Sequence, residues 1–397
     1  AGVFISVHLE AKKQGYQRCI VPKENLQEGE LIEGMQVIGV QSLQEVCAIL
    51  KGEKKPTDDK GRTRAEIMLN KATYPDFADI RGQHLVKRAV EVAVAGNHNI
   101  LMVGPPGAGK TAIAKRIPSI LPPLTLDESL ELTMIYSIVG QLNQNSPLKT
   151  ERPFREVHQT VTQTALIGGG IFPRPGEISM AHKGVLFLDE IAEFPKNILD
   201  NLRQPLEEHS IKIVRERGEY EFPAEFLLVA AMNPCPCGYR GDSVHSCRCS
   251  QSAVMKYQSR ISGPLLDRID IQIEVPPVPP RDLPTLKPGE PSAVIRERVV
   301  RARKVQAERY RNFPNVHTNA EVKSRELLRV CNMSPTVRES LPRLISRLGL
   351  SARAYDKVLR VSRTIADLQG ADAVTEQHLF EAVSFRKLDG DDSDFWI

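Results

Sequence analysis

One glycine-rich segment limits the possible folds of this chain more than any other feature. Gly104-Pro-Pro-Gly-Ala-Gly-Lys110-Thr111 matches the full phosphate-loop pattern. An apolar run at 100–103 precedes it, and a helical pattern begins near Thr111. Glycines let the backbone N–H groups face a polyphosphate, and the following helix points its positive dipole end at the same anion. We therefore predict a strand–loop–helix unit that binds ATP through Gly104, Pro105, Pro106, Gly107, Ala108, Gly109, Lys110 and Thr111.

Polar residues that complete such a site follow two further apolar runs. Asp189 and Glu190 come directly after the run at 184–188, and Asn233 follows the run at 226–232. Lys110 is predicted to reach the β and γ phosphates, and Thr111 and Asp189 are predicted to hold Mg²⁺. Glu190 is the candidate base for the attacking water, which the Asn233 amide would orient. Asparagine after a strand is also a common turn former, which is the alternative for Asn233.

The order of these runs predicts an α/β fold. Apolar strands that alternate with helices favour a mostly parallel sheet with helices on both faces. Seven prolines lie between residues 276 and 291, and helices cannot cross such a segment. Helical spacing beyond it predicts a small all-α domain, with helices at 293–310, 324–331, 338–348, 352–368 and 375–385. We divide the chain into an α/β tail (1–52), a linker (53–70), a nucleotide-binding domain (71–280), a proline-rich linker (281–292) and a helical lid (293–397).

Charge and hydropathy narrow the possible partners. The net charge is 53 − 49 = +4, too small to indicate nucleic-acid binding by itself. Residues 296–363 hold 17 Lys or Arg against 6 Asp or Glu, which indicates either a phosphate-facing surface or a solvated helical face. The apolar run at 226–232 has seven residues, whereas a spanning helix needs about 20. We expect a soluble, cytoplasmic protein without a membrane partner.

Four of the seven cysteines are crowded into one segment: Cys235, Cys237, Cys247 and Cys249. Two close pairs in a cytosolic chain suggest a metal before a disulfide, and four thiolates suit tetrahedral Zn²⁺. His245 is a possible substitute ligand. Free or redox-labile thiols are the alternative. A zinc ion with four protein ligands would be structural because no coordination position stays open.

Two loops are candidates for contact with a phosphate backbone. Residues 210–223 are predicted to form a hairpin that turns at Gly218 and carries Lys212, Arg215 and Arg217. A basic hairpin can follow a phosphate backbone without reading bases, although a solvated hairpin is the alternative. The glycine- and proline-rich loop that contains Arg174 is inserted between Lys110 and Asp189, and functional loops are the usual explanation for such insertions.

Two further arginines are candidates for sensing nucleotide. Arg268 ends the sheet domain and is a candidate finger for a neighbouring subunit's γ-phosphate. Its alternative is an ion pair within the chain, with Asp267 or Asp270. Arg353 opens a helix of the lid and is a candidate second sensor, with an exposed helix arginine as the alternative.

The order of these motifs resembles that of the AAA+ ATPases. More narrowly, the segments 152–155, 165–170, 173–179, 232–238 and 262–268 are similar to the magnesium-chelatase-like family. Residues 1–52, chiefly 19–25, resemble the end of a Lon-protease-like domain whose larger part is absent here. The resemblance implies an AAA+ domain with a helical lid and a ring, usually a hexamer, with ATP between subunits. Arg268 would then act in trans, and Arg353 would belong to the lid.

The resemblance also implies a function on DNA. The loops at 166–180 and 210–223 are similar in position to those of ring helicases, and the implied activity is branch migration of recombining DNA during natural transformation. We therefore expect an ATP-driven ring that binds single-stranded or branched DNA. Two alternatives remain open. One is a protein-remodelling ATPase of the magnesium-chelatase motor-subunit type. The other is a nucleotide-dependent scaffold, which would have no need of the base Glu190.

Overall fold

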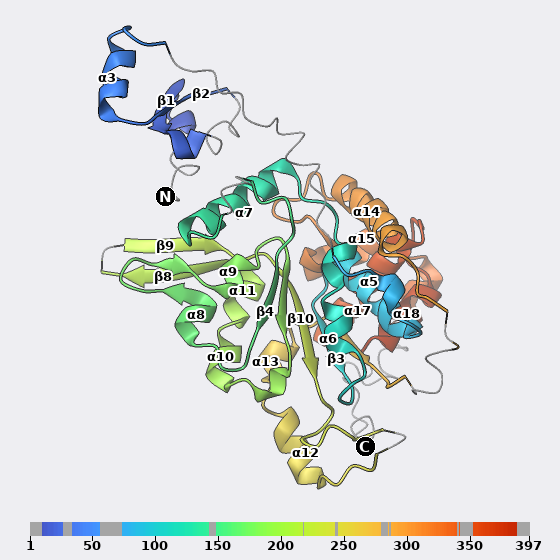
Figure 1. The fold of residues 1–397 in the computed structure, drawn as a ribbon. Helices are drawn as coiled ribbons and strands as arrows, with labels where there is room; N and C mark the ends of the chain where they lie inside the picture. The colour runs from blue at the N-terminus through green and yellow to red at the C-terminus, as the bar shows by residue number, and fades with distance from the viewer. Residues whose placement is uncertain are drawn as a thin grey trace.

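The computed structural model describes residues 10–26, 34–55, 74–142, 148–216, 218–242, 245–278, 285, 287–339, 341 and 352–386, without the side chains of 352 and 353. Its centre is a five-stranded parallel sheet in the order β11-β3-β10-β7-β4 (Figure 1). The strands are β3 (Ile100–Val103), β4 (Phe154–Val157), β7 (Val185–Leu188), β10 (Leu227–Met232) and β11 (Ile271–Glu274). The predicted parallel α/β fold is confirmed.

The central strands are apolar at every position because both faces of the sheet are covered. Every residue of β3, β7 and β10 is buried. Successive side chains point to opposite faces, so Ile100 and Met102 join one core and Leu101 and Val103 join the other. Carboxyl ends of parallel strands meet at one edge, which places the ends of β3, β7 and β10 together.

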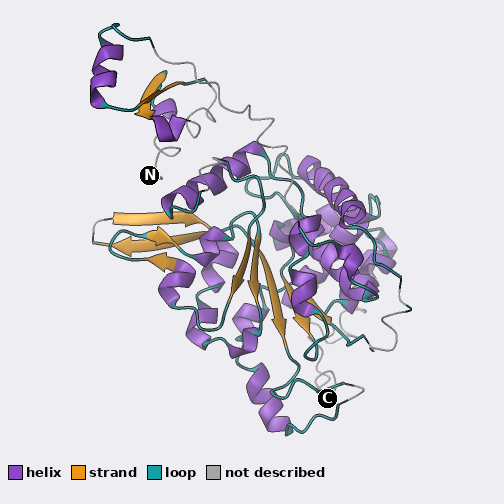
Figure 2. Cartoon of the chain, in the orientation of Figure 1, coloured by secondary structure: helices purple, strands orange, loops and turns teal. Residues whose placement is uncertain are grey.

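Helices cover both faces (Figure 2). The first core contains residues of α5 (His84–Gly96), α6 (Lys110–Ala114), α14 (Ser292–Arg309), α15 (Ser324–Cys331), α17 (Ala352–Leu368) and α18 (Glu376–Ser384). The second contains residues of α8 (Gln163–Ile167), α9 (Glu177–Met180), α10 (Lys196–Asp200), α12 (Gln251–Gln258) and α13 (Gly263–Leu266). The remaining labelled helices of this region are α7 (Leu126–Ile138) and α11 (Arg203–Glu208). None of the helices in the described segments is long and apolar enough to cross a bilayer.

Two antiparallel hairpins extend the side of the sheet domain that carries β4 (Figure 1). The larger one pairs β8 (Ser210–Arg215) with β9 (Gly218–Pro223), in the place predicted for it. Gly218, the predicted turn residue, is instead the first residue of β9 and pairs with Arg215. The smaller one pairs β5 (Gly168–Gly169) with β6 (Arg174–Pro175) between α8 and α9.

The C-terminal region is helical, as predicted, and some of its positively charged residues are paired inside the protein. Arg363 is 1% exposed and pairs with Asp367, which also receives two hydrogen bonds from Arg309. Arg303 donates to the carbonyl of Val94, and Arg298 pairs with two glutamates. These cations fit neither alternative from the sequence. Others, such as Arg301, Lys304 and Arg311, are exposed, as both alternatives require. Of the predicted helix at 338–348, residues 340 and 342–348 lie outside the described residues.

The N-terminal segment has its own small unit. A parallel pair joins β1 (Arg18–Pro22) to β2 (Gln36–Val40), and α3 (Leu43–Leu50) follows, capped by the Ser42 hydroxyl. This is the short α/β pattern expected from the sequence. Of the linker predicted at 53–70, only residues 53–55 are described.

Candidate nucleotide site and surrounding elements

The phosphate loop curls because two of its glycines have left-handed backbones. Gly107 has φ 78° and Gly109 has φ 92°, values that side chains other than glycine rarely adopt. The helix α6 begins directly afterwards, at Lys110. The loop follows β3 at the carboxyl edge of the sheet, so its backbone N–H groups and the start of α6 are available to an anion.

Lys110 lies in the centre of this edge. Its side chain is buried, and Nζ donates to the carbonyls of Gly104 (2.6 Å) and Pro105 (2.9 Å) and to Oδ1 of Asn233 (3.2 Å). Burial lowers the pKa of Lys110 to about 8, against the opposing effect of Asp189 and Glu190. The ammonium is therefore mainly charged at pH 7, and it is held by neutral groups that a phosphate can replace.

The acidic pair at the end of β7 faces the phosphate loop. The hydroxyl of Thr111 donates to Oδ2 of Asp189 over 2.7 Å. Hydroxyl and carboxylate oxygens are the ligand types that Mg²⁺ prefers, so the two residues fit the predicted role. The backbone N–H of Glu190 donates to the other oxygen of Asp189, and Glu190 has a left-handed φ of 51° with an exposed side chain. The structure thus forms a group of two hydrogen-bonded pairs, Lys110–Asn233 and Thr111–Asp189, which adjoin because Lys110 and Thr111 are consecutive. Glu190 borders the second pair.

Arg268 lies outside that group within this chain. Its guanidinium pairs with Glu207 of α11, and Nη1 donates to the carbonyl of Pro264 over 2.5 Å. An ion pair within the chain, the alternative from the sequence, is therefore present, with Glu207 as a partner that the sequence did not indicate. Asp270 instead contacts buried His98, with 3.2 Å between Oδ2 and Nδ1. The sequence provided no signal for Glu207, which precedes Arg268 by 61 residues.

The second arginine sensor is only partly described. Arg353 belongs to the first turn of α17, but its side chain lies outside the described residues. Arg217 of the β8–β9 hairpin also lies outside them.

The two hairpins carry the remaining candidate DNA residues. Arg174, Lys212 and Arg215 are exposed. The hairpins are neighbours, because a Cβ on Gly169 would lie 3.4 Å from Nη2 of Arg215. Lys212 is opposite Glu221 in the strand register. Residues 210–223 contain three cations and three anions, so this hairpin has no net charge.

Sequence analysis did not single out the apolar tip of the smaller hairpin. Ile171 is 85% exposed and Phe172 is 74% exposed, between β5 and β6. Because Ile171 and Phe172 lie at the tip of this hairpin, they are not packed in any core of the described residues. The combination of glycine, proline and two large apolar residues could have indicated an exposed contact point.

The cysteine-rich loop also lies near the nucleotide site. The Sγ atoms of the four cysteines predicted to bind a metal lie within 4.8 Å of one another, so this cluster could hold an ion. The pKa of the Cys237 thiol is lowered, chiefly by the backbone N–H of Tyr239, whereas burial raises that of Cys235. His245 is not a member of the cluster, since its ring stacks near Tyr239 and faces Asp242.

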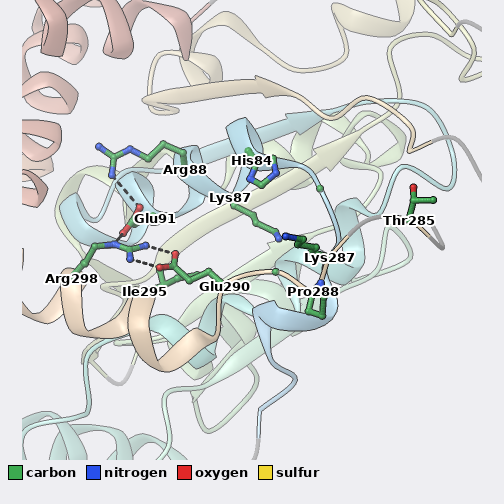
Figure 3. Close-up of a pocket in the computed structure, with 12 residues that line it drawn as sticks. His84, Lys87, Arg88, Glu91, Thr285, Lys287, Pro288, Glu290, Ile295 and Arg298 are labelled. Carbon is green, nitrogen blue, oxygen red and sulfur yellow. Dashed lines mark hydrogen bonds and ion pairs between the residues drawn. The ribbon is translucent and has the colours of Figure 1, made fainter. Parts of the chain in front are cut away.

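A separate cavity of about 600 Å³ lies between α5 and the segment before α14 (Figure 3). Arg298 pairs with Glu91 and Glu290 across it, and Arg88 also pairs with Glu91. Lys87 donates to the carbonyl of Ile80. The Arg298–Glu91 ion pair joins α14 to α5, so it stabilises the packing of these two helices beside the cavity. No phosphate-loop residue lines it.

Comparison with known proteins places this arrangement in a family. The family models "Magnesium chelatase, subunit ChlI" and "Magnesium chelatase, subunit ChlI C-terminal" match residues 76–283 and 289–386. Uncharacterized protein YifB of Escherichia coli is 42% identical over 392 residues, covering 97% of this chain and 74% of the relative. Competence protein ComM of Haemophilus influenzae is 42% identical over 382 residues, covering 95% and 73%.

More distant relatives agree with the fold. Lon protease 2 of Bacillus subtilis is 25% identical over 254 residues, 57% of this chain and 40% of that protein, which is compatible with a Lon-like tail. The matched family models span both the phosphate-loop domain and the helical region after it. The chain therefore belongs to the magnesium-chelatase-like AAA+ family, among the ComM and YifB proteins.

Proposed function

We propose that this protein is an ATP-hydrolysing ring motor that acts on DNA, as a branch-migration helicase that promotes homologous recombination in natural transformation. The observation that supports ATP hydrolysis is the pair of contacts Lys110–Asn233 and Thr111–Asp189 at the carboxyl edge of the sheet. The DNA part is supported by the two exposed neighbouring hairpins and by the similarity to a relative named as a competence protein.

Each residue of the site has a role in phosphoryl transfer to water. Lys110 exchanges its carbonyl partners for phosphate oxygens, and the loop N–H groups hold the same anion. Thr111 and Asp189 would hold the Mg²⁺ that accompanies ATP, which neutralises phosphate charge. The exposed Glu190 carboxylate accepts a proton from the attacking water, and Asn233 orients that water. Thus the site stabilises the charge of the transition state while Glu190 activates the nucleophile.

A ring, which we propose to be a homohexamer, would complete the site. Arg268 lies outside the phosphate-loop group of its own chain, held by Glu207. In a ring it would leave Glu207 and meet the γ-phosphate bound by the neighbouring subunit, where an arginine stabilises developing charge. Arg353 would contribute from the lid helix α17.

Branched DNA is expected to stimulate ATP hydrolysis several-fold. The test compares steady-state phosphate release with and without four-way junction DNA, with Lys110→Ala as the blank. Stimulation that disappears in Lys110→Ala supports a DNA motor. Turnover that is indifferent to every DNA form would contradict the DNA part and leave the ATPase part intact.

Removal of the Phe172 ring is expected to weaken DNA binding. Stacking of an aromatic side chain on a base contributes about 1–3 kcal/mol, so Phe172→Ala should raise the DNA Kd about fivefold to 150-fold. Fluorescence anisotropy with a labelled junction measures it. The matched control is Phe380→Ala, which removes another exposed ring, from α18. Equal DNA affinity of the two variants would contradict a DNA contact at Phe172.

The second candidate is a protein-remodelling ATPase of the magnesium-chelatase motor-subunit type. The absence of net charge on residues 210–223 favours it, since a phosphate backbone attracts an excess of cations. A relative from Methanocaldococcus jannaschii, 21% identical over 341 residues (80% of this chain, 85% of the relative), is named "Magnesium-chelatase subunit ChlI homolog". The DNA-stimulation experiment separates the two candidates.

A further inference from the structure

The four-cysteine cluster has the dimensions of a site for one tetrahedral ion. The Sγ atom of Cys235 lies 3.4 Å from that of Cys237 and 3.6 Å from that of Cys247, and Cys237 and Cys247 are 3.6 Å apart. A zinc ion with bonds of about 2.3 Å to sulfur separates its ligands by roughly 3.8 Å. A disulfide would require about 2.05 Å. The spacing therefore favours an ion over a pair of disulfides.

The chemistry of the cluster selects the ion. Four thiolates are soft ligands, which favour Zn²⁺ over Mg²⁺ or Ca²⁺. Four protein ligands also leave no open position for a substrate or water, as in structural sites. Cys235 is fully buried, so the ion would be anchored beneath the loop rather than on its surface.

The same loop contacts the nucleotide site at two places. It starts at Asn233, the partner of Lys110, and its first ligand follows two residues later. Gly238, which follows the ligand Cys237, packs on the phosphate loop so closely that a Cβ there would lie 2.7 Å from Cδ of Pro106. The N–H of Gly238 donates to the carbonyl of Cys235 over 2.9 Å, which closes this turn.

The far end of the loop is tied to the same turn. The helix α12 begins one residue after Ser250, which follows the ligand Cys249 and caps the helix with its hydroxyl. From α12, the Gln258 side-chain amide donates to the carbonyl of Pro234 over 3.1 Å. An ion that joins Cys235 and Cys237 to Cys247 and Cys249 would therefore hold both ends of the loop in place against the phosphate loop.

We propose that Cys235, Cys237, Cys247 and Cys249 hold one Zn²⁺, and that this ion clamps the turn at 233–238 onto the phosphate loop and so strengthens nucleotide binding. The proposed zinc site depends only on the four cysteines, whereas the proposed effect on nucleotide binding also depends on the proposed function of the phosphate loop. Linkage requires that zinc strengthen ATP binding by the same factor by which ATP strengthens zinc binding.

The first experiment counts metal in the full chain purified under reducing conditions. We expect one zinc per chain in the wild type and none in the Cys247→Ser/Cys249→Ser variant. The control is Cys47→Ser, an exposed cysteine outside the cluster, which should keep its zinc. Substitution by Co²⁺ should produce the absorption of a tetrahedral thiolate site. Wild-type protein that contains no zinc and binds no Zn²⁺ stoichiometrically would overturn the metal site.

The second experiment tests the clamp by equilibrium binding of a fluorescent ATP analogue. Removal of zinc by a chelator should raise the Kd about fivefold or more, and added Zn²⁺ should restore it. Gly238→Ala should raise the Kd while the zinc content stays at one per chain. The added methyl group meets Pro106, and the left-handed φ of 85° at Gly238 disfavours alanine in this turn. This variant separates the clamp from loss of folding. ATP should also slow zinc release to the chelator.

Two different failures can be told apart. An unchanged Kd both after zinc removal and in Gly238→Ala would overturn the clamp. Analogue binding that persists at wild-type strength in Lys110→Ala would overturn the nucleotide site, and with it the clamp, but would leave the zinc count intact.

Discussion

Glu190→Gln is expected to lower the kcat for ATP hydrolysis by about 10²–10⁴-fold, the usual contribution of a general base. The glutamine side chain is the same size but cannot accept a proton from water. ATP binding should be retained, because Lys110 and the Thr111–Asp189 pair do not depend on the Glu190 side chain in their contacts. Phosphate release at saturating ATP, together with binding of a fluorescent ATP analogue, measures the two effects separately.

The matched control for this variant is Glu193→Gln. Glu193 lies three residues further along the chain and pairs with Arg260 at the surface. Its loss should leave kcat near the wild-type value, since exposed ion pairs contribute about 0–1 kcal/mol. A Glu190→Gln protein that hydrolyses ATP at the wild-type rate would contradict the base assignment and would favour a nucleotide-dependent scaffold.

Arg268→Ala is expected to lower kcat by about 10³–10⁵-fold, as removal of an arginine finger does. The distinctive result should appear on mixing. Arg268→Ala and Lys110→Ala subunits are each inactive alone, but a mixed ring places an intact phosphate loop beside an intact Arg268. Hydrolysis should therefore recover in part when the two variants are mixed before assembly, and it should depend on their ratio.

The matched control removes the partner of Arg268 within the chain. Glu207→Gln breaks the ion pair that holds Arg268 in this structure and leaves the arginine free to reach a neighbour. Its kcat should stay close to that of the wild type. If the mixed rings stay inactive although each variant still assembles, Arg268 does not act in trans. If Arg268→Ala alone keeps wild-type turnover, it is not a finger.

Local pattern predicted the elements of the sheet domain well, for a physical reason. The strands β3, β7 and β10 are buried on both faces, so their sequences are uninterrupted apolar runs. The end of each run therefore showed where the polar site residues begin, as at Asp189 and Asn233. The predicted strand at 100–103 has the same bounds in the structure, and the helices at 324–331 and 352–368 also agree. The glycines of the phosphate loop are readable because left-handed φ angles exclude most other residues.

Contacts between distant segments could not be predicted in this way. The partner of Arg268 comes from α11, and two basic residues of the lid, Arg309 and Arg363, pair with the buried Asp367. A count of charges along the chain cannot distinguish a surface cation from one that is buried and paired, because burial depends on how the helices pack. The approach of Gly238 to Pro106 likewise joins two loops from different strands.

The phosphate loop, the acidic pair, the four cysteines and the alternation of strands and helices could all be read from short stretches of sequence. All of these are encoded locally, by backbone sterics or by the periodic burial of side chains. The strand order β11-β3-β10-β7-β4, by contrast, emerges only from the packed fold, and it brings Lys110 to Asn233 and Thr111 to Asp189. It also placed the cysteine loop against the phosphate loop. These contacts join residues far apart in the chain, so they exist only once the core has packed.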